Sequence, residues 1–382
     1  MDKDKNLLIA IDGNEANVEN RVGVNQFAFE VIWGMYRINK DKKRKDNFRV
    51  FLQDKPLSDL PPKTSWWQYE AFGPRLFWTR TGLVKRLFLR TPKPDVLYSP
   101  SHYGPGISPI PYVISVMDLG FLKFQNQFTK KDLFQLKSWT KQAVKKARKI
   151  IAISEFTKKD IVKNYQIEKD KVVVAYPGFK KTGSKSKKII KKGTLTDLGI
   201  GTDYILYLGT MKPSKNIENL IKAFNVLISE KRIKNTKLVI AGKKGWLYQS
   251  IYDQVKKLRL EDKVVFTGFV TDSLAKALIK NANVFTLVSY WEGFGIPVLE
   301  AMSLGSPVVC STAGALPEIT GNAASLVNPK NYHQIADEIE KVLKNKQFRV
   351  SLIKRGKTRS KMFDWQTCSK IILNTIISSA KK

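Results

Sequence analysis

Cysteine, histidine and long apolar runs are all scarce in this sequence. Its two cysteines, Cys310 and Cys368, supply neither a disulfide framework nor a metal cluster, so a reducing compartment is expected. The first residues lack the apolar stretch of a signal peptide, and no segment approaches the roughly 18 apolar residues of a membrane span. These absences predict a cytoplasmic protein that can lie peripherally on the inner face of the membrane without crossing it.

Acidic residues are scarce relative to basic ones. The 382 residues include 67 Lys and Arg but only 33 Asp and Glu, which gives a net charge of +34. The excess is spread evenly over the two halves of the chain, whereas a nucleic-acid groove would concentrate it. Zinc spacing, a helix-turn-helix signal and an aromatic RNA motif are also missing. The charge therefore favours general attraction to anionic surfaces or a simple lysine bias, and a basic nucleic-acid-binding protein is the weaker alternative.

Signatures of bound cofactors and metals are missing as well. Neither Gly-x-Gly-x-x-Gly nor a Walker loop occurs, which excludes the dinucleotide-binding and NTPase classes. Asp2-Lys3-Asp4 has the spacing of an Asp-x-Asp metal motif, but a chain terminus is a poor place to hold a metal ion. We therefore expect no cofactor and no obligatory metal.

The sequence does contain a regular alternation of short apolar runs with longer amphipathic segments. This alternation favours parallel α/β sheets, and 382 residues are too many for one ordinary core. A run rich in Lys, Ser and Gly at residues 180–193 separates two such halves. Strands are predicted at residues 7–12, 48–52, 94–100, 112–118, 149–154, 172–178, 204–209, 237–241, 264–267, 284–288 and 307–310.

The most informative segment is residues 290–305, in which Glu292 and Glu300 flank a Gly-x-Gly turn. Pro297 suits the first turn of a helix and Gly305 suits its end. The spacing therefore predicts a helix with Glu300 on its first turn and Glu292 on the loop before it. Backbone N–H groups at such a helix start bind anions, and carboxylates accept hydrogen bonds from sugar hydroxyls. The segment indicates a nucleotide-sugar site.

The run Glu-Gly-Phe-Gly-Ile-Pro-Val-Leu-Glu-Ala-Met in this segment resembles the Glu-x7-Glu signature of the group 1 (GT4-like) retaining glycosyltransferases. The resemblance covers nearly the whole chain. It implies the α/β GT-B fold, in which two Rossmann-like doubly wound domains face an interdomain cleft. The implied parts are an acceptor-side domain at 1–180, a Lys-rich linker at 181–202, a nucleotide-sugar-binding domain at 203–362, and a C-terminal helix at 363–382 that crosses back to the first domain.

The resemblance also assigns roles to particular residues. It implies catalytic roles for Glu292, which faces the donor sugar, for Lys215, which neutralises the donor diphosphate, and for Asp118. Glu300 would bind the ribose hydroxyls, and a glycine loop at Gly23 would approach the diphosphate. The implied donor-binding residues are Gly23, Gly209, Lys212, Lys215, Gly242, Val270, Glu292, Gly293, Phe294, Gly295, Ile296 and Glu300.

The chain departs from the family pattern at two places. Thr210 and Ser214 stand on the phosphate loop where many relatives have an arginine, and Lys212 would compensate without the bidentate fork of Arg. Met117 stands where relatives often have a histidine near the transferred sugar. His102 follows a strand that faces the same cleft, although a loop histidine without a special role is the favoured interpretation.

Several assignments have a structural alternative. Lys215 can be a solvated surface lysine, Gly23 an ordinary turn residue, and Phe269 a buried core residue rather than a platform for the nucleobase. The segment Arg75–Arg90 is basic, aromatic and free of acids. Such a segment suits contact with an anionic membrane, and an ordinary packed helix with solvated charges is equally favoured.

The expected function is the retaining transfer of a hexose, of mannose or glucose type, from a UDP- or GDP-linked sugar to a glycan or lipid-linked acceptor. The setting would be synthesis of cell-envelope polysaccharide or glycolipid. A non-catalytic sugar-nucleotide binder is the alternative that Met117 and the missing arginine motivate, and an epimerase is the rival within the fold.

Overall fold

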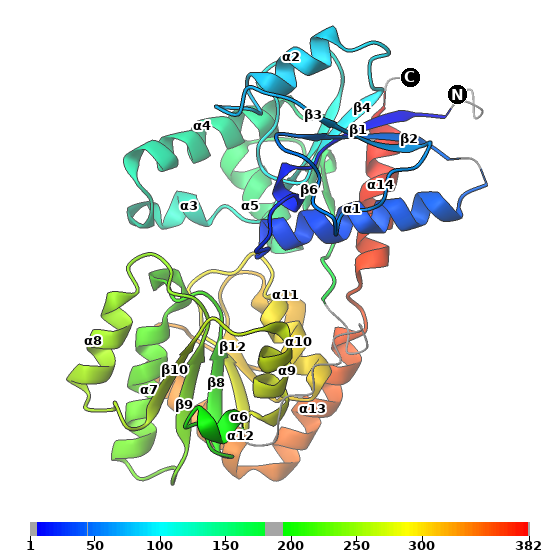
Figure 1. Cartoon of the computed structure of the whole chain (residues 1–382). Helices are drawn as coiled ribbons and strands as arrows, with labels where there is room; N and C mark the ends of the chain where they lie inside the picture. Colours follow the sequence, from blue (N-terminus) through cyan, green and yellow to red (C-terminus); the bar gives the residue numbers. More distant parts are fainter. Residues whose placement is uncertain (1–5, 44, 180–193, 381–382) are drawn as a thin grey trace. The chain divides into compact units, whose positions relative to one another are not determined.

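The computed structural model describes residues 6–43, 45–179 and 194–380 (Figure 1). The Lys-rich run at 180–193 and the Asp-x-Asp spacing at the N-terminus lie outside these residues. The chain divides into two compact units: unit 1 is Met1–Gly178 with Asp364–Lys382, and unit 2 is Phe179–Phe363. No helix in the described ranges is long and apolar enough to cross a membrane.

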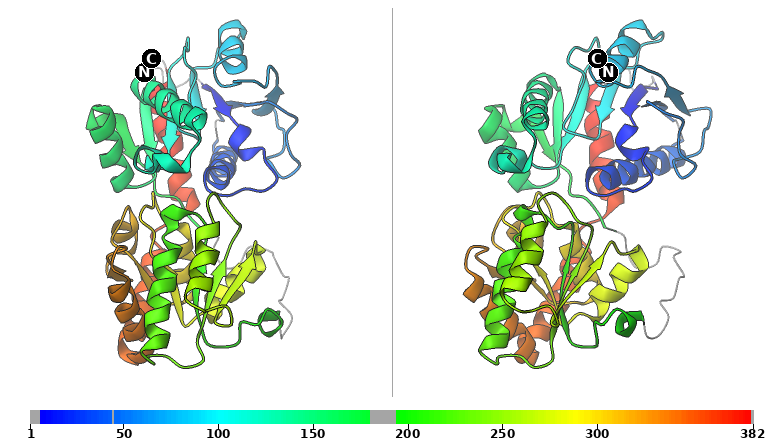
Figure 2. Two further views of the ribbon diagram at one scale, coloured as in Figure 1. Left: turned by 90° about the vertical axis from the view of Figure 1, so that its left-hand side faces the viewer. Right: turned by 60° about the vertical axis from the view of Figure 1, so that its left-hand side comes forward.

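Unit 1 is built on a seven-stranded sheet in the order β3-β2-β1-β4-β5-β6-β7, and every neighbouring pair is parallel. All residues of β4 and β5 are buried, because helices cover both faces of the sheet (Figure 2). The strands are β1 (Leu8–Asp12), β2 (Asn47–Leu52), β3 (Trp67–Ala71), β4 (Val96–Ser99), β5 (Tyr112–Val116), β6 (Lys149–Ala152) and β7 (Val172–Val174).

The helices of unit 1 include the last helix of the chain. They are α1 (Val24–Asp41), α2 (Gly82–Leu89), α3 (Gly120–Lys123), α4 (Lys130–Lys146), α5 (Glu155–Tyr165) and α14 (Trp365–Ser379). α14 packs along α1, where the rings of Phe27 and Trp365 have centroids 6.0 Å apart. Gly34 of α1 carries no side chain, which admits Ser369 of α14. The predicted return of the C-terminal helix to the first domain is confirmed.

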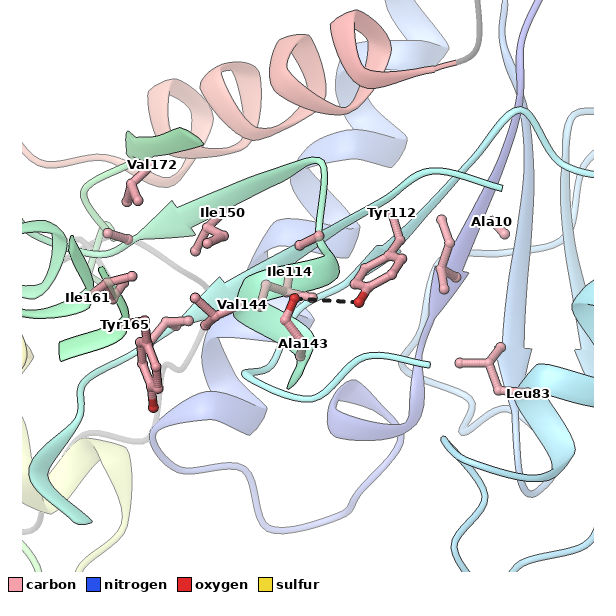
Figure 3. Close-up of a cluster of buried hydrophobic side chains, with 14 of the residues drawn as sticks. Ala10, Leu83, Tyr112, Ile114, Ala143, Val144, Ile150, Ile161, Tyr165 and Val172 are labelled. Atoms are coloured by element: carbon pink, nitrogen blue, oxygen red, sulfur yellow. Dashed lines mark hydrogen bonds between the residues drawn. The ribbon is translucent and has the colours of Figure 1, made fainter. Parts of the chain in front are cut away.

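A cluster of buried side chains fills the space between this sheet and helices α2, α4 and α5 (Figure 3). Ile114 of the sheet and Val144 of α4 are fully buried in it. Tyr112 is buried there too, and its hydroxyl donates a hydrogen bond to the carbonyl of Ala143 at 3.4 Å. The polar atom of the ring is therefore satisfied inside an apolar core.

Unit 2 repeats the architecture with a six-stranded parallel sheet in the order β10-β9-β8-β11-β12-β13. Its strands are β8 (Tyr204–Leu208), β9 (Lys237–Ala241), β10 (Val264–Gly268), β11 (Val284–Leu287), β12 (Val308–Ser311) and β13 (Ser325–Val327). Its helices are α6 (Thr194–Asp197), α7 (Ile217–Ser229), α8 (Gln249–Lys257), α9 (Asp272–Asn281), α10 (Ile296–Leu304), α11 (Leu316–Thr320), α12 (Tyr332–Lys344) and α13 (Lys346–Ser360), and the short 3₁₀ helix η4 (Pro213–Lys215) precedes α7.

Every predicted strand is present, with ends that differ by one or a few residues. Two strands, β3 and β13, were not predicted, because one is a partly exposed edge strand and the other has only three residues. The segment Arg75–Arg90 is not one helix: α2 begins at Gly82, and turns precede it. Trp78 in these turns and Leu83 and Leu87 of α2 are buried.

Candidate functional site

The loops after β8 and β11 meet through an ion pair at the carboxyl edge of the unit 2 sheet. Nζ of Lys215 lies 2.6 Å from Oε1 of Glu292, and the two side chains are only 18% and 11% exposed. The hydroxyl of Ser289 donates to the same carboxylate oxygen at 2.7 Å. Lys215 is therefore not a solvated surface lysine. The carboxyl edge of a parallel sheet is where α/β proteins bind ligands.

Asn216 fixes the backbone next to Lys215. It adopts a φ of +58°, a conformation that asparagine tolerates better than most residues. Its buried side-chain amide donates to the carbonyls of Val288 at 2.9 Å and Pro329 at 2.6 Å. The N–H of Tyr290 also donates to the carbonyl of Ser214 at 2.9 Å. Sequence reasoning missed this residue, and its only signal was an asparagine directly after the candidate lysine.

The Gly-x-Gly turn leads into α10 as predicted, with one correction. Gly295 precedes the helix with a φ of +102°, and a Cβ there would lie 2.6 Å from Leu316. Pro297 stands in the first turn and Gly305 ends the helix at a φ of +82°. Because the helix begins at Ile296, Glu300 lies at the start of the second turn and not on the first. At the start of α10 the N–H of Ile296 has no partner within the helix, Pro297 has no N–H, and the N–H of Val298 donates to the Gly295 carbonyl at 3.0 Å.

Glu292 is also held from the loop after β12. The N–H of Ala315 donates to its carbonyl at 2.9 Å. Gly314 lies so close to the same backbone that any side chain at this position would clash with the Glu292 carbonyl, and it has a φ of +68°. Three successive loops of the sheet edge, after β8, β11 and β12, thus position one carboxylate.

The loops after β8, β9 and β10 stand side by side because of two of the predicted glycines. The N–H of Gly209 donates to the Ala241 carbonyl, and the N–H of Gly242 donates to the Gly268 carbonyl, each at 2.9 Å. Gly242 has a φ of +142°, and any Cβ on it would clash with the carbonyl of Gly209. Phe269, in the loop after β10, is 69% exposed. The prediction that it is a buried core residue is wrong, and the adjoining Val270 is partly buried.

Lysines collect on these loops. Lys212 lies in the loop after β8 and Lys243 in the loop after β9, and the Lys243 carbonyl accepts a hydrogen bond from the N–H of Met211 at 3.0 Å. The ammonium of Lys244 lies 4.9 Å from the ring centre of Tyr248. Together, Lys212, Lys243 and Lys244 give the edge of the unit 2 sheet a positive character that suits an anionic ligand.

The candidate residues of unit 1 lie on loops at the carboxyl edge of its own sheet. Gly23 precedes α1 with a φ of +55° and has open space where a side chain would be. Asp118 accepts a hydrogen bond from the N–H of Gly120 at 2.7 Å, at the start of α3. The carbonyl of Met117 accepts from the hydroxyl of Thr157 at 3.2 Å. Both the methionine and its acidic neighbour thus have structural contacts.

His102 and two acidic residues complete this edge. The His102 ring packs on Tyr103, with centroids 4.3 Å apart, and burial lowers the pKa of His102 to about 4, so the ring is neutral near pH 7. Asp12 ends β1 and accepts from the side-chain amide of Asn14 at 2.9 Å. Burial raises the pKa of Asp12 to about 7, and the charge of Glu15 adds to the rise. Sequence reasoning missed both acids, although an aspartate directly after an apolar strand was a usable signal.

Comparison with known proteins identifies matching families along most of the chain. A model for glycosyl transferases group 1 matches residues 197–359, and a model for glycosyltransferase family 4 matches residues 47–181. O-antigen chain mannosyltransferase B of Escherichia coli is 30% identical over 238 residues, which cover 61% of each chain. O-antigen chain mannosyltransferase RfbU of Salmonella typhimurium is 28% identical over 60% of this chain and 62% of its own. The alignments thus span about three fifths of these curated relatives.

Solved structures give the same fold over the whole chain. Sucrose-phosphate synthase from Thermosynechococcus elongatus has a TM-score of 0.73 at 18% identity, covering 97% of this chain and 98% of its own. Anabaena HepE, crystallised with UDP and glucose, has a TM-score of 0.72 at 19% identity and covers 97% and 100%. At such identities the likeness concerns the fold alone, and the predicted GT-B architecture is confirmed.

Proposed function

Because the chain belongs to the group 1 glycosyltransferases, we propose that it moves a hexose from a nucleotide diphosphate sugar to a glycan or lipid-linked acceptor. The observation that carries the proposal is the ion pair of Lys215 and Glu292 at the carboxyl edge of the unit 2 sheet. One ammonium, one carboxylate and the N–H groups at the start of α10 are what a sugar linked to a diphosphate needs.

In the proposed reaction the donor replaces this internal ion pair. The diphosphate accepts hydrogen bonds from Lys215 and from the N–H groups of Phe294, Gly295 and Ile296, while Glu292 accepts from the sugar hydroxyls. When the bond between sugar and phosphate breaks, negative charge grows on the leaving diphosphate, and Lys215 stabilises it. The acceptor hydroxyl attacks from the face of the sugar that the diphosphate leaves, and the leaving phosphate takes the proton of this hydroxyl. The configuration of the sugar is therefore retained.

The proposed chemistry requires neither a metal nor a cofactor. The charge of the diphosphate is met by Lys215, with Lys212 and Lys243 on the neighbouring loops. Glu300 binds the ribose hydroxyls from the second turn of α10. Addition of a chelator should therefore leave donor binding unchanged.

The relatives support the proposed class of sugar and its destination. Both O-antigen relatives are named as mannosyltransferases, and the HepE crystals hold UDP and glucose. For this chain we propose a UDP- or GDP-linked hexose of mannose or glucose type, used in cell-envelope polysaccharide or glycolipid synthesis. The reaction would take place in the cytoplasm.

A peripheral contact with the inner face of an anionic membrane, through the segment Arg75–Arg90, belongs to the same proposal. Four apolar side chains of this segment are between 46% and 72% exposed, which supports the contact. They are Leu76, Phe77, Phe88 and Leu89. A lipid-linked acceptor would be presented at such a surface.

A donor screen tests the proposal. The protein is titrated with UDP- and GDP-sugars while its melting temperature is recorded, and mass spectrometry then follows donor hydrolysis. At least one donor should raise the melting temperature, because a ligand that binds only the folded state stabilises it. Glu300→Ala should abolish this rise, whereas Glu261→Ala, at an exposed acid of unit 2, should preserve it. A rise that is equal in both variants would refute the site.

A further inference from the structure

The basic residues of the segment Arg75–Arg90 differ in what they contact. Arg86 and Arg90 both bind Glu70 of β3, at 2.5 and 2.9 Å. Arg75 forms an ion pair with Asp54. Three of the five basic side chains in the segment are therefore paired with a carboxylate, two of them with the same one, and the remaining two are Arg80 and Lys85. The positive surface of this segment is smaller than its sequence indicates.

Arg80 differs from these three arginines in its contacts. Its guanidinium lies 4.8 Å from the ring centre of Trp139 in α4, and it donates hydrogen bonds to the carbonyl of Trp139 at 3.4 Å and to the side chain of Gln142. In the described ranges it makes no salt bridge, and its buried Nε has no hydrogen-bond partner. Burial lowers the pKa of Arg80. A half-buried guanidinium without an anion is costly, and a phosphate oxyanion is its natural partner.

The backbone at Gly106 leaves room for this guanidinium. A Cβ on Gly106 would lie 2.6 Å from Nη1 of Arg80. Nζ of Lys146 donates to the Gly106 carbonyl at 2.9 Å, so a second cation stands beside the first. The turn before α2, the loop at Gly106 and helix α4 thus converge on one positive point, although they are far apart in the sequence.

Exposed apolar side chains belong to the same three segments. Leu76 is 72% exposed and Phe77 is 46% exposed, and the Phe77 ring contacts Trp139 with centroids 5.8 Å apart. Ile107, next to Gly106, is 63% exposed. A site for a free phosphate or a nucleotide would not need exposed apolar side chains around it. A half-buried cation beside exposed apolar groups fits a ligand that carries a phosphate next to hydrocarbon.

We propose that Arg80 binds the headgroup phosphate of a membrane phospholipid, while Leu76, Phe77 and Ile107 enter the interfacial layer of an anionic bilayer. This inference deepens the membrane contact proposed above and rests on it. It assigns the main phosphate contact to Arg80, which α4 holds in place, and not to the basic residues of helix α2. Lys146 and the exposed lysines of α4 then attract the anionic surface from longer range.

Vesicle flotation tests the inference on the full chain. The vesicles contain either phosphatidylcholine alone or a mixture with phosphatidylglycerol, and inorganic phosphate is added to a third sample. The wild type should bind the mixed vesicles even with the added phosphate. Arg80→Gln should weaken binding about fivefold, because one basic group near the surface contributes about 1 kcal/mol. Arg80→Lys should bind the mixed vesicles more weakly than the wild type and more tightly than Arg80→Gln. The double variant Leu76→Ser with Ile107→Ser should bind the mixed vesicles about tenfold more weakly. Both side chains are exposed, so their replacement leaves the fold intact.

The matched control is Lys257→Gln, at an exposed lysine at the end of α8 in unit 2. If it weakens binding as much as Arg80→Gln, the diffuse charge of the chain explains the attraction and the inference is wrong. Displacement of the wild type by inorganic phosphate would overturn it as well, because the site would then serve a free oxyanion. The donor-dependent rise in melting temperature is measured on every variant. An intact rise with lost flotation leaves hexose transfer standing, whereas a missing rise in the wild type counts against the transfer alone.

Discussion

The carboxyl edges of the two sheets have the same architecture and a different balance of charged groups. In unit 2 the edge presents Lys212, Lys215 and Lys243, with the carboxylate of Glu292 paired to Lys215 and the start of α10 beside them. In unit 1 the corresponding edge presents the carboxyl groups of Asp12 and Glu15 with neutral polar groups. A parallel sheet brings loops together, but it does not decide what they bind. The difference supports the proposal that unit 2 binds an anionic donor and unit 1 a neutral, hydroxyl-rich acceptor.

The largest expected effect comes from removing the cation of the unit 2 edge. Lys215→Met should lower kcat/KM for the donor by about 10²–10³, the loss typical of one group that stabilises developing negative charge. The variant also leaves Glu292 without its ion pair. Steady-state kinetics measure the loss, and Lys231→Met, on an exposed turn of the same unit, is the matched control. A rate within threefold of the control would remove Lys215 from the mechanism.

Replacing one glycine in each unit compares how tightly the loops of the two edges are packed, with the free energy of unfolding as the measure. Gly242→Ala should lower the free energy of unfolding by about 3 kcal/mol, because its φ of +142° suits glycine and the new Cβ would clash with the Gly209 carbonyl. Gly23→Ala should cost only about 1 kcal/mol, because its Cβ meets open space and only the φ of +55° is unfavourable. Urea unfolding measures both variants. Equal losses would mean that the loops after β8 and β9 are not packed as described.

Structural features that depend on residues close together in the chain could be predicted from the sequence, whereas those that depend on contacts between distant residues could not. Apolar runs predicted the strands of both sheets, because a parallel strand buried on both faces must be apolar along its length. β3 escaped this rule, since Trp67–Ala71 is an edge strand with polar, partly exposed residues. The capping proline and glycine predicted α10, although the helix start at Ile296 moved Glu300 into the second turn.

The site is predictable only where one local segment contains it. The two glutamates and their glycines form a single motif, but the contact of Lys215 with Glu292 joins residues 77 apart in the chain. Gly314 and Asn216 matter through backbone conformations and contacts that no local pattern encodes. The burial that raises the pKa of Asp12 likewise depends on packing in three dimensions.

The carboxyl group of Asp12 should make the stability of unit 1 depend on pH. Its folded-state pKa of about 7 lies above the ordinary value of 3.8, so the folded chain holds a proton that the unfolded chain releases. This contribution is complete below pH 4 and is lost as the pH rises to about 7, at up to about 1.4 kcal/mol per pH unit. Between pH 5 and pH 7 the wild type should therefore lose about 2 kcal/mol more than Asp12→Asn. Urea unfolding at both pH values checks this, and parallel curves for the two proteins would show that Asp12 titrates normally.

The smallest expected effect on activity tests whether the unit 1 edge serves the acceptor. Glu15 accepts a hydrogen bond from Asn25 at 2.7 Å, which holds its side chain in place near neutral Tyr103, although burial raises the pKa of Glu15. A hydrogen bond from an acceptor hydroxyl to such a carboxylate is worth about 1.5 kcal/mol or more. Glu15→Gln should therefore raise the acceptor KM about tenfold while the donor-dependent rise in melting temperature stays unchanged. Glu19→Gln, at an exposed acid of the same loop, should change neither quantity. A variant that loses the donor response instead would place donor recognition on unit 1 and reverse the comparison.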